Sequence, residues 1–276
     1  MSTGIFAHHA HVFPESVRAD GTIERLLRLL DECGIDGAVC FAPFSFQVRH
    51  AGVHPNGWLA EAIAPHSRLV GFGTIDFARH DVKDQVRQCA QLGLRGLKLH
   101  PNVQEFDVLS PRAMEVYAAA EEQGLFVTFH TGVHHSRLED CRLLKFDEVA
   151  RRFPRLRFSM EHMGGYHFFH EALAVLANHY PPPWEKRRCN VFAGLVSVFT
   201  LHQNRFWYLR PDQIMEIILQ TSAEQVIFGL DFPYNLERET LIGLETIRGL
   251  GLEEADFRKI LGGNLRRELG LEPAAA

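Results

Sequence analysis

The sequence predicts an α/β protein that folds as a (β/α)8 barrel of the TIM type with additional C-terminal helices. Short apolar runs rich in β-branched and aromatic residues alternate with amphipathic stretches eight times along the 276 residues, which is the order of a parallel barrel. The first run ends in histidines and lacks the Gly-rich phosphate turn of a doubly wound open sheet. We expect residues 1–276 to form a single domain.

The strands are predicted from apolar runs that are bounded by turn residues. The run at 37–43, GAVCFAP, is typical of a buried strand. The eight predicted strands are Gly4–His8, Gly37–Pro43, Arg68–Ile75, Leu94–His100, Leu125–His130, Leu156–His162, Asn190–Val196 and Val226–Asp231.

The helices are predicted from apolar spacing and from their end signals. The stretch TIERLLRLLDEC at 22–33 places its leucines on one face and stops at Gly34. Ser110 and Pro111 provide an N-cap and a first-turn proline for a helix that Gly124 ends. The other predicted helices are Asn56–Pro65, Asp81–Leu92, Lys145–Phe153, His170–His179, Pro211–Gln220, Glu237–Leu250 and Glu253–Leu269, with a turn at Gly262-Gly263-Asn264 expected to end one helix and start the next near the barrel.

The composition excludes several classes of protein. The formal net charge of −5 and the lack of a Lys/Arg-rich run argue against nucleic acid or an anionic membrane as a partner. Five cysteines with wide spacing and no CxxC pair argue against a disulfide framework or a cysteine zinc site. The N-terminus does not read as a signal peptide, and no apolar run approaches the roughly 20 residues of a membrane helix. We therefore expect a cytoplasmic protein.

Ionisable side chains gather at the ends of five predicted strands. Barrel enzymes place their chemistry at the C-terminal ends of the strands, so these side chains are expected to meet in one site. They are His9 and His11 after strand one, Lys98 and His100 on strand four, His130 on strand five, His162 on strand six and Asp231 on strand eight.

The spacing of His9 and His11 predicts that both imidazoles point the same way, because side chains two apart share one face of a strand. Two imidazoles joined by others and by one carboxylate suit a divalent metal of intermediate softness, such as zinc. Chance is the alternative, since the chain has 16 histidines.

Six motifs, in this order and at these strand ends, resemble the amidohydrolase superfamily. The nearest branch is that of the amidohydrolase-related (amidohydrolase 2) metal-dependent hydrolases, which includes aminocarboxymuconate-semialdehyde decarboxylase and the resorcylate-type decarboxylases. The resemblance extends from residue 5 to about residue 270. The motifs are HxH at 9–11, GLKLHP at 96–101, HTG at 130–132, EHMGG at 161–165, FGLDFPY at 228–234 and GGNLRR at 262–267.

The resemblance implies a mononuclear site with one divalent metal ion, zinc by default and manganese as the alternative. It implies that the metal ligands are His9, His11, His130 and Asp231, that Asp231 also acts on water, and that His162 is a general base or acid. One departure is Ala7, where the family often has an aspartate two residues before the first ligand, so a supporting partner of the ligands is missing there. Dimers are common in the family, so a homodimer is possible.

Three further residues are expected to contact a small-molecule substrate, namely Lys98, His100 and Arg137. Lys98 has three interpretations: a lysine at the rim of the pocket, a carboxylated bridge between two metals, or a cation for a substrate carboxylate. Arg137 suits a carboxylate because guanidinium binds anions in a bidentate manner. Core packing and an apolar pocket are both open for the aromatic residues Phe13, Phe44, Phe46, Trp207 and Tyr234.

The function that the sequence favours is metal-dependent hydrolysis of a small molecule through a hydroxide held by the metal. The first alternative is non-oxidative decarboxylation of an unsaturated or aromatic acid, which an electropositive pocket with Lys98 and Arg137 both inside would support. A roomy neutral pocket would support hydrolysis. The second alternative is a non-catalytic metal-binding protein.

Overall fold

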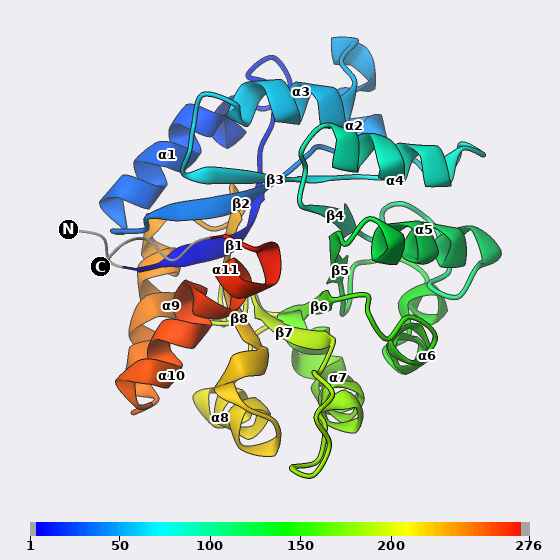
Figure 1. Ribbon diagram of the computed structural model, residues 1–276. Coiled ribbons are helices and arrows are strands. Elements are labelled where there is room, and N and C mark those ends of the chain that lie inside the picture. The colour runs from blue at the N-terminus through cyan, green and yellow to red at the C-terminus, as the bar shows by residue number, and fades with distance from the viewer. Residues whose placement is uncertain (1–3, 272–276) are drawn as a thin grey trace.

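The computed structural model describes residues 4–271 and contains a closed barrel of eight parallel strands. Each strand pairs with the next along the chain, and β8 pairs with β1 to close the ring (Figure 1). The prediction of a TIM-type barrel is confirmed. The strands are β1 (Phe6–His11), β2 (Gly37–Phe41), β3 (Leu69–Gly73), β4 (Gly96–Leu99), β5 (Phe126–His130), β6 (Phe158–Glu161), β7 (Val191–Leu195) and β8 (Val226–Phe232).

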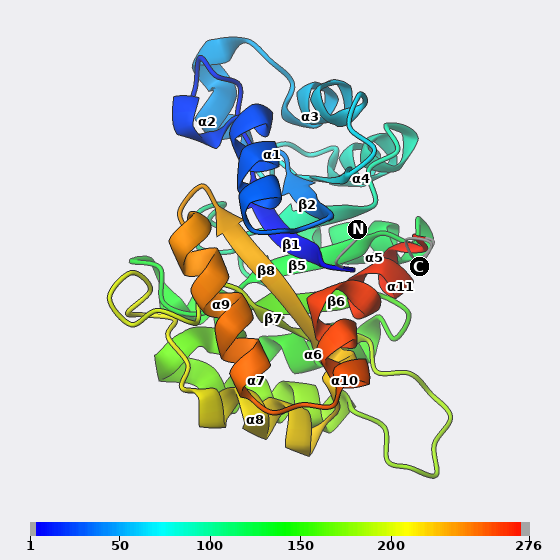
Figure 2. The ribbon, with the colours of Figure 1, turned by 90° about the vertical axis from the view of Figure 1, so that its left-hand side faces the viewer.

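Helices surround the strands, as Figures 1 and 2 show from two directions. The helices between the strands are α1 (Ile23–Glu32), α2 (Ser45–Val48), α3 (Pro55–Ile63), α4 (Val82–Gln91), α5 (Pro111–Glu122), α6 (Lys145–Arg152), α7 (Gly165–His179) and α8 (Pro211–Gln220). After β8 come α9 (Glu237–Gly249), α10 (Glu254–Arg258) and α11 (Asn264–Leu269). Short 3-10 turns are η1 (Ala19–Gly21), η2 (Arg49–Ala51), η3 (Leu138–Cys141), η4 (His162–Gly164) and η5 (Ala223–Gln225), and η6 (Lys259–Gly263) is a π-helical segment.

The largest differences from the sequence-based expectation lie in three predicted elements. Strand β1 runs to His11, three residues beyond the predicted end at His8, and α7 begins at Gly165 instead of His170. The predicted helix Glu253–Leu269 is divided into α10, η6 and α11. Its interruption lies at Gly262, where a Cβ atom would approach the backbone nitrogen of Phe6 to 2.7 Å. The glycine thus lets the C-terminal segment cross directly beneath β1.

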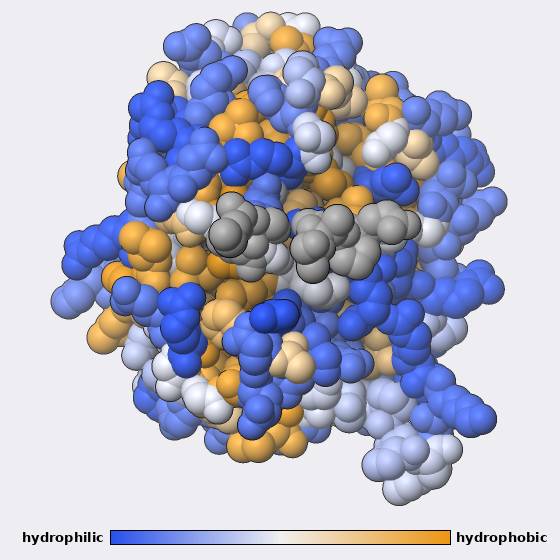
Figure 3. Space-filling model, turned by 60° about the vertical axis from the view of Figure 1, so that its left-hand side comes forward, coloured by the Kyte–Doolittle hydropathy of each residue, from blue (hydrophilic) through white to orange (hydrophobic). Residues whose placement is uncertain are grey.

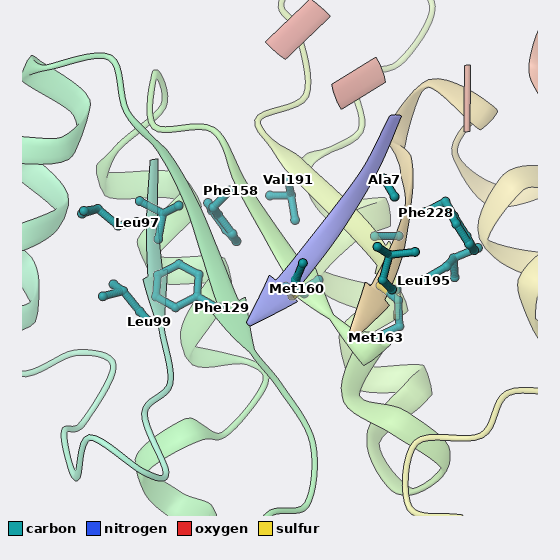
Figure 4. Packing of buried hydrophobic residues seen from close by; sticks show 14 of the residues in the cluster. Ala7, Leu97, Leu99, Phe129, Phe158, Met160, Met163, Val191, Leu195 and Phe228 are labelled. Carbon is teal, nitrogen blue, oxygen red and sulfur yellow. The ribbon is translucent and has the colours of Figure 1, made fainter. Parts of the chain in front are cut away.

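The main core lies between the barrel strands and the helices. On β4, Leu97 and Leu99 point into this layer, and Phe129 of β5 packs beside them (Figure 4). Because side chains alternate along a strand, Lys98 faces the interior of the barrel. The same alternation on β6 directs Met160 outward and Glu161 inward.

The interior of the barrel is apolar at the end where the strands begin and polar at the end where they finish. Its apolar end is a cluster of phenylalanines and aliphatic side chains that α11 closes from below. The ring centroid of Phe72 lies 5.9 Å from that of Phe41 and 6.1 Å from that of Phe126. Above it lie His8, Thr128, Ser159 and Glu161, all with no exposed surface. This order confines the chemically versatile groups to the C-terminal ends of the strands.

The surface carries both hydrophilic and hydrophobic side chains. Hydrophilic residues cover much of the face drawn in Figure 3, and hydrophobic ones lie between them. Within residues 4–271, no helix combines the length and hydropathy that crossing a membrane requires. All five cysteines are buried free thiols.

Candidate functional site

A cavity of about 390 Å³ opens at the C-terminal ends of the strands. It collects the ionisable residues that the sequence singled out at five strand ends, together with side chains of the connecting loops. The lining residues are His9, His11, Phe44, Phe46, Gln47, Lys98, His100, Val103, His130, His134, His162, Gln203, Asn204, Trp207, Asp231 and Tyr234.

Three of these side chains form a cluster with the dimensions of a metal site. The Nε2 atom of His9 lies 3.2 Å from Nε2 of His11 and 3.4 Å from Oδ1 of Asp231, and the His11–Asp231 distance is 3.7 Å. Ligands held 2.0–2.1 Å from a tetrahedral ion lie roughly 3.3 Å apart. The three ligand atoms therefore have the separations that a single divalent ion requires.

His9 reaches this position through an irregularity in β1. The pairing register shifts between Ala7 and Ala10, and His9 has a positive φ of 68°. This β-bulge adds a residue to the strand, so His8 and His9 both face the interior, whereas Ala7 and Ala10 pack outward in the main core. The inward direction of His9 and His11 agrees with the prediction, but simple alternation does not account for His8.

Left-handed backbone is concentrated at the site. His9, His162, Ser197 and Asp231 have φ values of 68°, 64°, 53° and 61°, a region that non-glycine residues rarely adopt. Such conformations persist where the surrounding structure holds them, and they cluster at functional sites. Here they direct the side chains at the ends of β1, β6 and β8 into one cavity.

His162 is held by its Nδ1 atom, which lies 2.6 Å from the carbonyl oxygen of Val196. A carbonyl only accepts, so Nδ1 carries the proton and Nε2 is the nitrogen left to exchange one. The indole of Trp207 stacks on the ring at 4.9 Å between centroids. Burial lowers the pKa of His162 to about 4, and the charge of Lys98 adds to the effect. The imidazole is therefore neutral near pH 7.

Asp231 directs one carboxylate oxygen toward His9 and His11, and its other oxygen accepts a hydrogen bond that holds the side chain in place. The hydroxyl of Ser197 donates to Oδ2 of Asp231, and the amide of Asn235 donates to the same hydroxyl at 2.9 Å. Burial raises the pKa of Asp231 to about 6. Oδ1 stays directed at His9 and His11.

His130 and His100 form the adjacent wall. Their rings stack at 3.8 Å and 9°, and burial holds the pKa of each well below its usual value. The Nε2 atom of His130 is buried and lacks a hydrogen-bond partner among the described residues. His130 is not part of the close His9–His11–Asp231 cluster, but it lines the same cavity. Buried polar atoms are rarely left unpaired, so this imidazole nitrogen fits a site built for a divalent cation.

Among residues 4–271, Lys98 is the one lysine or arginine that lines the cavity, and 1% of its surface is exposed. Its Nζ atom lies 3.4 Å from Nε2 of His9 and 5.1 Å from the centroid of the Phe41 ring. Burial lowers the pKa of Lys98 to about 8, although the carboxylates of Glu161 and Asp231 oppose the shift. The amine therefore keeps its charge near pH 7 inside the cavity.

The sequence-based reasoning missed His8 and Glu161. Glu161 directs Oε2 at Nδ1 of His9, 2.6 Å away, and at Nδ1 of His8, 3.3 Å away. Burial raises the pKa of Glu161, but interaction with these imidazoles lowers it further, to well below the usual value. The signals were present in the runs HHAH and EHMGG, but the bulge that turns His8 inward is not visible in them.

Arg137 is not brought to the cavity. Its side chain is 74% exposed and pairs with Asp140 at 3.2 Å, just before η3. This local ion pair holds the guanidinium in solvent. Four of the five candidate aromatic residues, Phe44, Phe46, Trp207 and Tyr234, do line the cavity, whereas Phe13 is packed in the core.

Solved structures with the same fold come from several bacterial enzymes. The chain matches 5-carboxyvanillate decarboxylase LigW from Sphingomonas paucimobilis with a TM-score of 0.71 and 18% identity, covering 97% of this chain and 99% of that one. A protein assigned as a 2-pyrone-4,6-dicarboxylic acid hydrolase from Pseudomonas putida matches with a TM-score of 0.68, 19% identity and coverages of 96% and 97%. Dihydroxybenzoic acid decarboxylase from Polaromonas sp. JS666, solved with manganese and the inhibitor 2-nitroresorcinol, matches with a TM-score of 0.70, 15% identity and 97% coverage of both chains.

At these identities the solved structures establish the fold. A search of curated protein sequences finds no match. A family model, described as amidohydrolase, matches residues 7–271, which include all of the barrel strands except Phe6 and every residue of the cavity. This chain is therefore a member of the amidohydrolase family, whose enzymes depend on a divalent metal.

Proposed function

We propose that this protein is a metal-dependent decarboxylase that removes a carboxyl group, without oxidation, from a small planar aromatic or unsaturated acid. The observation that carries the proposal is Lys98, a charged amine buried beside the His-His-Asp cluster in a cavity with aromatic walls. An unpaired buried cation is costly, so an anionic substrate group is the expected partner of this amine.

The residues that would hold the metal are His9, His11 and Asp231, with His130 as the fourth ligand. Imidazole and carboxylate ligands suit zinc and manganese alike, and the related decarboxylase from Polaromonas was solved with manganese. A bound divalent ion would act as a Lewis acid toward an oxygen of the substrate.

The walls of the cavity match the proposed substrate in shape. Phe44 and Phe46 stack on one another with centroids 5.7 Å apart at the α2 side of the cavity, and Trp207 lies on the His162 side. Flat aromatic side chains favour a flat ring between them. The amine of Lys98 would bind the substrate carboxylate at the bottom of this slot.

Decarboxylation breaks the bond between the carboxyl carbon and its neighbour, and carbon dioxide departs. The electron pair of that bond stays on the neighbouring carbon, which must then gain a proton. His162 is placed for this transfer, because Val196 holds Nδ1 and leaves Nε2 facing the cavity. Since the neutral ring carries its proton on Nδ1, Nε2 would first take a proton from a substrate hydroxyl group or from water and then pass it to this carbon. Stacking on Trp207 fixes the plane in which the proton moves.

The test is an assay of the zinc- and manganese-loaded protein with a panel of hydroxybenzoic and related acids, monitored for carbon dioxide. In heavy water, the product should carry deuterium at the carbon that lost the carboxyl group. Replacing His162 with Asn should abolish that exchange while the metal content stays at about one equivalent. A lack of carbon dioxide with every acid, at full metal occupancy, would contradict the proposal.

Hydrolysis of an ester or lactone is the second candidate. The observation that favours it is the modest positive charge of the cavity. Arg137 lies outside, and in the described part of the chain Lys98 is the single lysine or arginine within the lining. The Pseudomonas relative assigned as a hydrolase has the same fold. Acid release from a panel of lactones in a pH-stat, with incorporation of ¹⁸O from labelled water, would select hydrolysis over decarboxylation.

A further inference from the structure

We propose that Glu161 is the positioning residue of the metal ligand His9, and that it fixes the imidazole tautomer in which Nε2 is free to bind the ion. Both residues are buried. The inference requires that the protein binds a metal, but it does not depend on which reaction follows.

The contact itself sets the tautomer. Oε2 of Glu161 lies 2.6 Å from Nδ1 of His9, a distance typical of a charge-assisted hydrogen bond. An ionised carboxylate can only accept, so Nδ1 must carry the proton. In a neutral imidazole the lone pair then resides on Nε2, which is the atom that faces His11 and Asp231.

Glu161 is held from below by a chain of buried polar groups. Nδ1 of His8 lies 3.3 Å from the same carboxylate oxygen, and Nε2 of His8 lies 3.0 Å from the hydroxyl of Thr128. Each of these side chains is fully buried. The carboxylate is therefore fixed between two imidazoles, one beneath it and one that reaches the cavity.

The neighbouring strand leaves space for this arrangement. Glu161 pairs in register with Gly194 of β7, and a Cβ atom on Gly194 would lie 2.3 Å from Oε1 of Glu161. Any larger residue at 194 would displace the carboxylate. The glycine is required by the position of Glu161 and not by a turn.

The alternative role for Glu161, as a ligand in a second metal site with His8 and His9, conflicts with the geometry. These three residues lie close enough together to be considered. However, two ligands of one tetrahedral ion lie roughly 3.3 Å apart, and the 2.6 Å between Glu161 and His9 is too short. The contact is a hydrogen bond that Nδ1 of His9 donates to Glu161.

The primary test is zinc affinity, measured by competition with a chromophoric chelator. Partners of this kind are worth about 10- to 100-fold in metal affinity, so Glu161→Leu should weaken zinc binding by about that factor. Glu161→Gln keeps an acceptor oxygen and should recover part of the loss. Gly194→Ala should weaken binding as well, and should add nothing further in the Glu161→Leu background.

The matched control is Glu268, a buried carboxylate on α11 that pairs with arginines at the opposite end of the barrel. Glu268→Leu removes a comparable charge and should leave zinc affinity unchanged. Equal losses from Glu161→Leu and Glu268→Leu would show a general effect on stability and would overturn the proposal.

The second readout is the imidazole ¹⁵N spectrum of the metal-free protein. In the wild type and in Glu161→Gln, Nδ1 of His9 should be the protonated nitrogen, and in Glu161→Leu the proton should redistribute toward Nε2. An unchanged tautomer and an unchanged zinc affinity in Glu161→Leu would refute the positioning role, as would a wild-type protein that takes up no zinc. A failed decarboxylation assay with normal zinc uptake would leave the role intact.

Discussion

Lys98 should reduce the stability of the metal-free protein, so replacing it with methionine should stabilise the fold. Methionine keeps an unbranched side chain of similar length that packs well in apolar surroundings, and it removes the charge. Lys98 has 1% of its surface exposed and contacts His9 and the Phe41 ring. No carboxylate of the described residues forms a direct ion pair with its amine.

The magnitude follows from the pKa of the amine. Burial lowers the pKa of Lys98 from 10.5 to about 8. A change of one in a pKa corresponds to about 1.4 kcal/mol of free energy. Keeping the amine charged in the folded state therefore costs about 3 kcal/mol below pH 8. The unfolded chain releases this proton near pH 10.5, so the cost declines between pH 8 and pH 10.5 and is absent above that range.

The assay is urea unfolding with a chelator present, at pH 7 and at pH 9.5. Lys98→Met should raise the free energy of unfolding by about 3 kcal/mol at pH 7 and by less than half of that at pH 9.5. Lys83 is the control, because it is half exposed and lies 3.8 Å from Glu115 on the surface, and Lys83→Met should change stability by less than about 0.5 kcal/mol. A Lys98→Met protein that is no more stable at pH 7, or whose gain is the same at both pH values, would refute the reasoning.

Four further outcomes are expected. His11→Ala should lose the single equivalent of metal that elemental mass spectrometry should find in the wild type; a retained equivalent would place the metal elsewhere. Zinc affinity should fall as the pH drops through about 6, because protonation of Asp231, whose pKa burial raises to about 6, removes a ligand; an affinity that is level from pH 5 to 8 would exclude Asp231. Ser197→Ala removes the hydroxyl that donates to Asp231 and should weaken zinc binding about 10-fold, as calorimetry can measure. Arg137→Ala should leave turnover unchanged within about twofold, since the guanidinium is exposed and paired with Asp140; a large loss of turnover would return Arg137 to the site.

The barrel was predictable because its signals are local and repeated. Each strand is a short apolar run, and each is followed by a helix whose limits are set by residues such as Ser110, Pro111 and Gly124. The rule that parallel barrels assemble their sites at the strand ends then brought together His9, Lys98 and Asp231, which are more than 80 residues apart in sequence. These predictions needed only periodicity and order.

The remaining features depend on contacts between distant segments. The inward direction of His8 requires a bulge opposite β2 and β8, and alternation alone would have turned it outward. Glu161 has meaning only beside Gly194 and His9. Arg137 was a reasonable anion ligand by chemistry, but its orientation is decided by a neighbour three residues away, Asp140. Propensity carries no information on any of these arrangements.

The cluster of phenylalanines in the lower interior of the barrel has a consequence for how substrate and product enter and leave. Phe41, Phe72, Phe126 and Phe192 fill the interior beneath the polar groups, and α11 seals them from below. The cavity lies at the opposite end of the barrel, and its lining includes Phe46 and Tyr234, which are each 45% exposed. Since no route leads out through the filled interior, substrate and product would both pass these exposed side chains, and a bulkier residue at 46 or 234 would narrow the route for both.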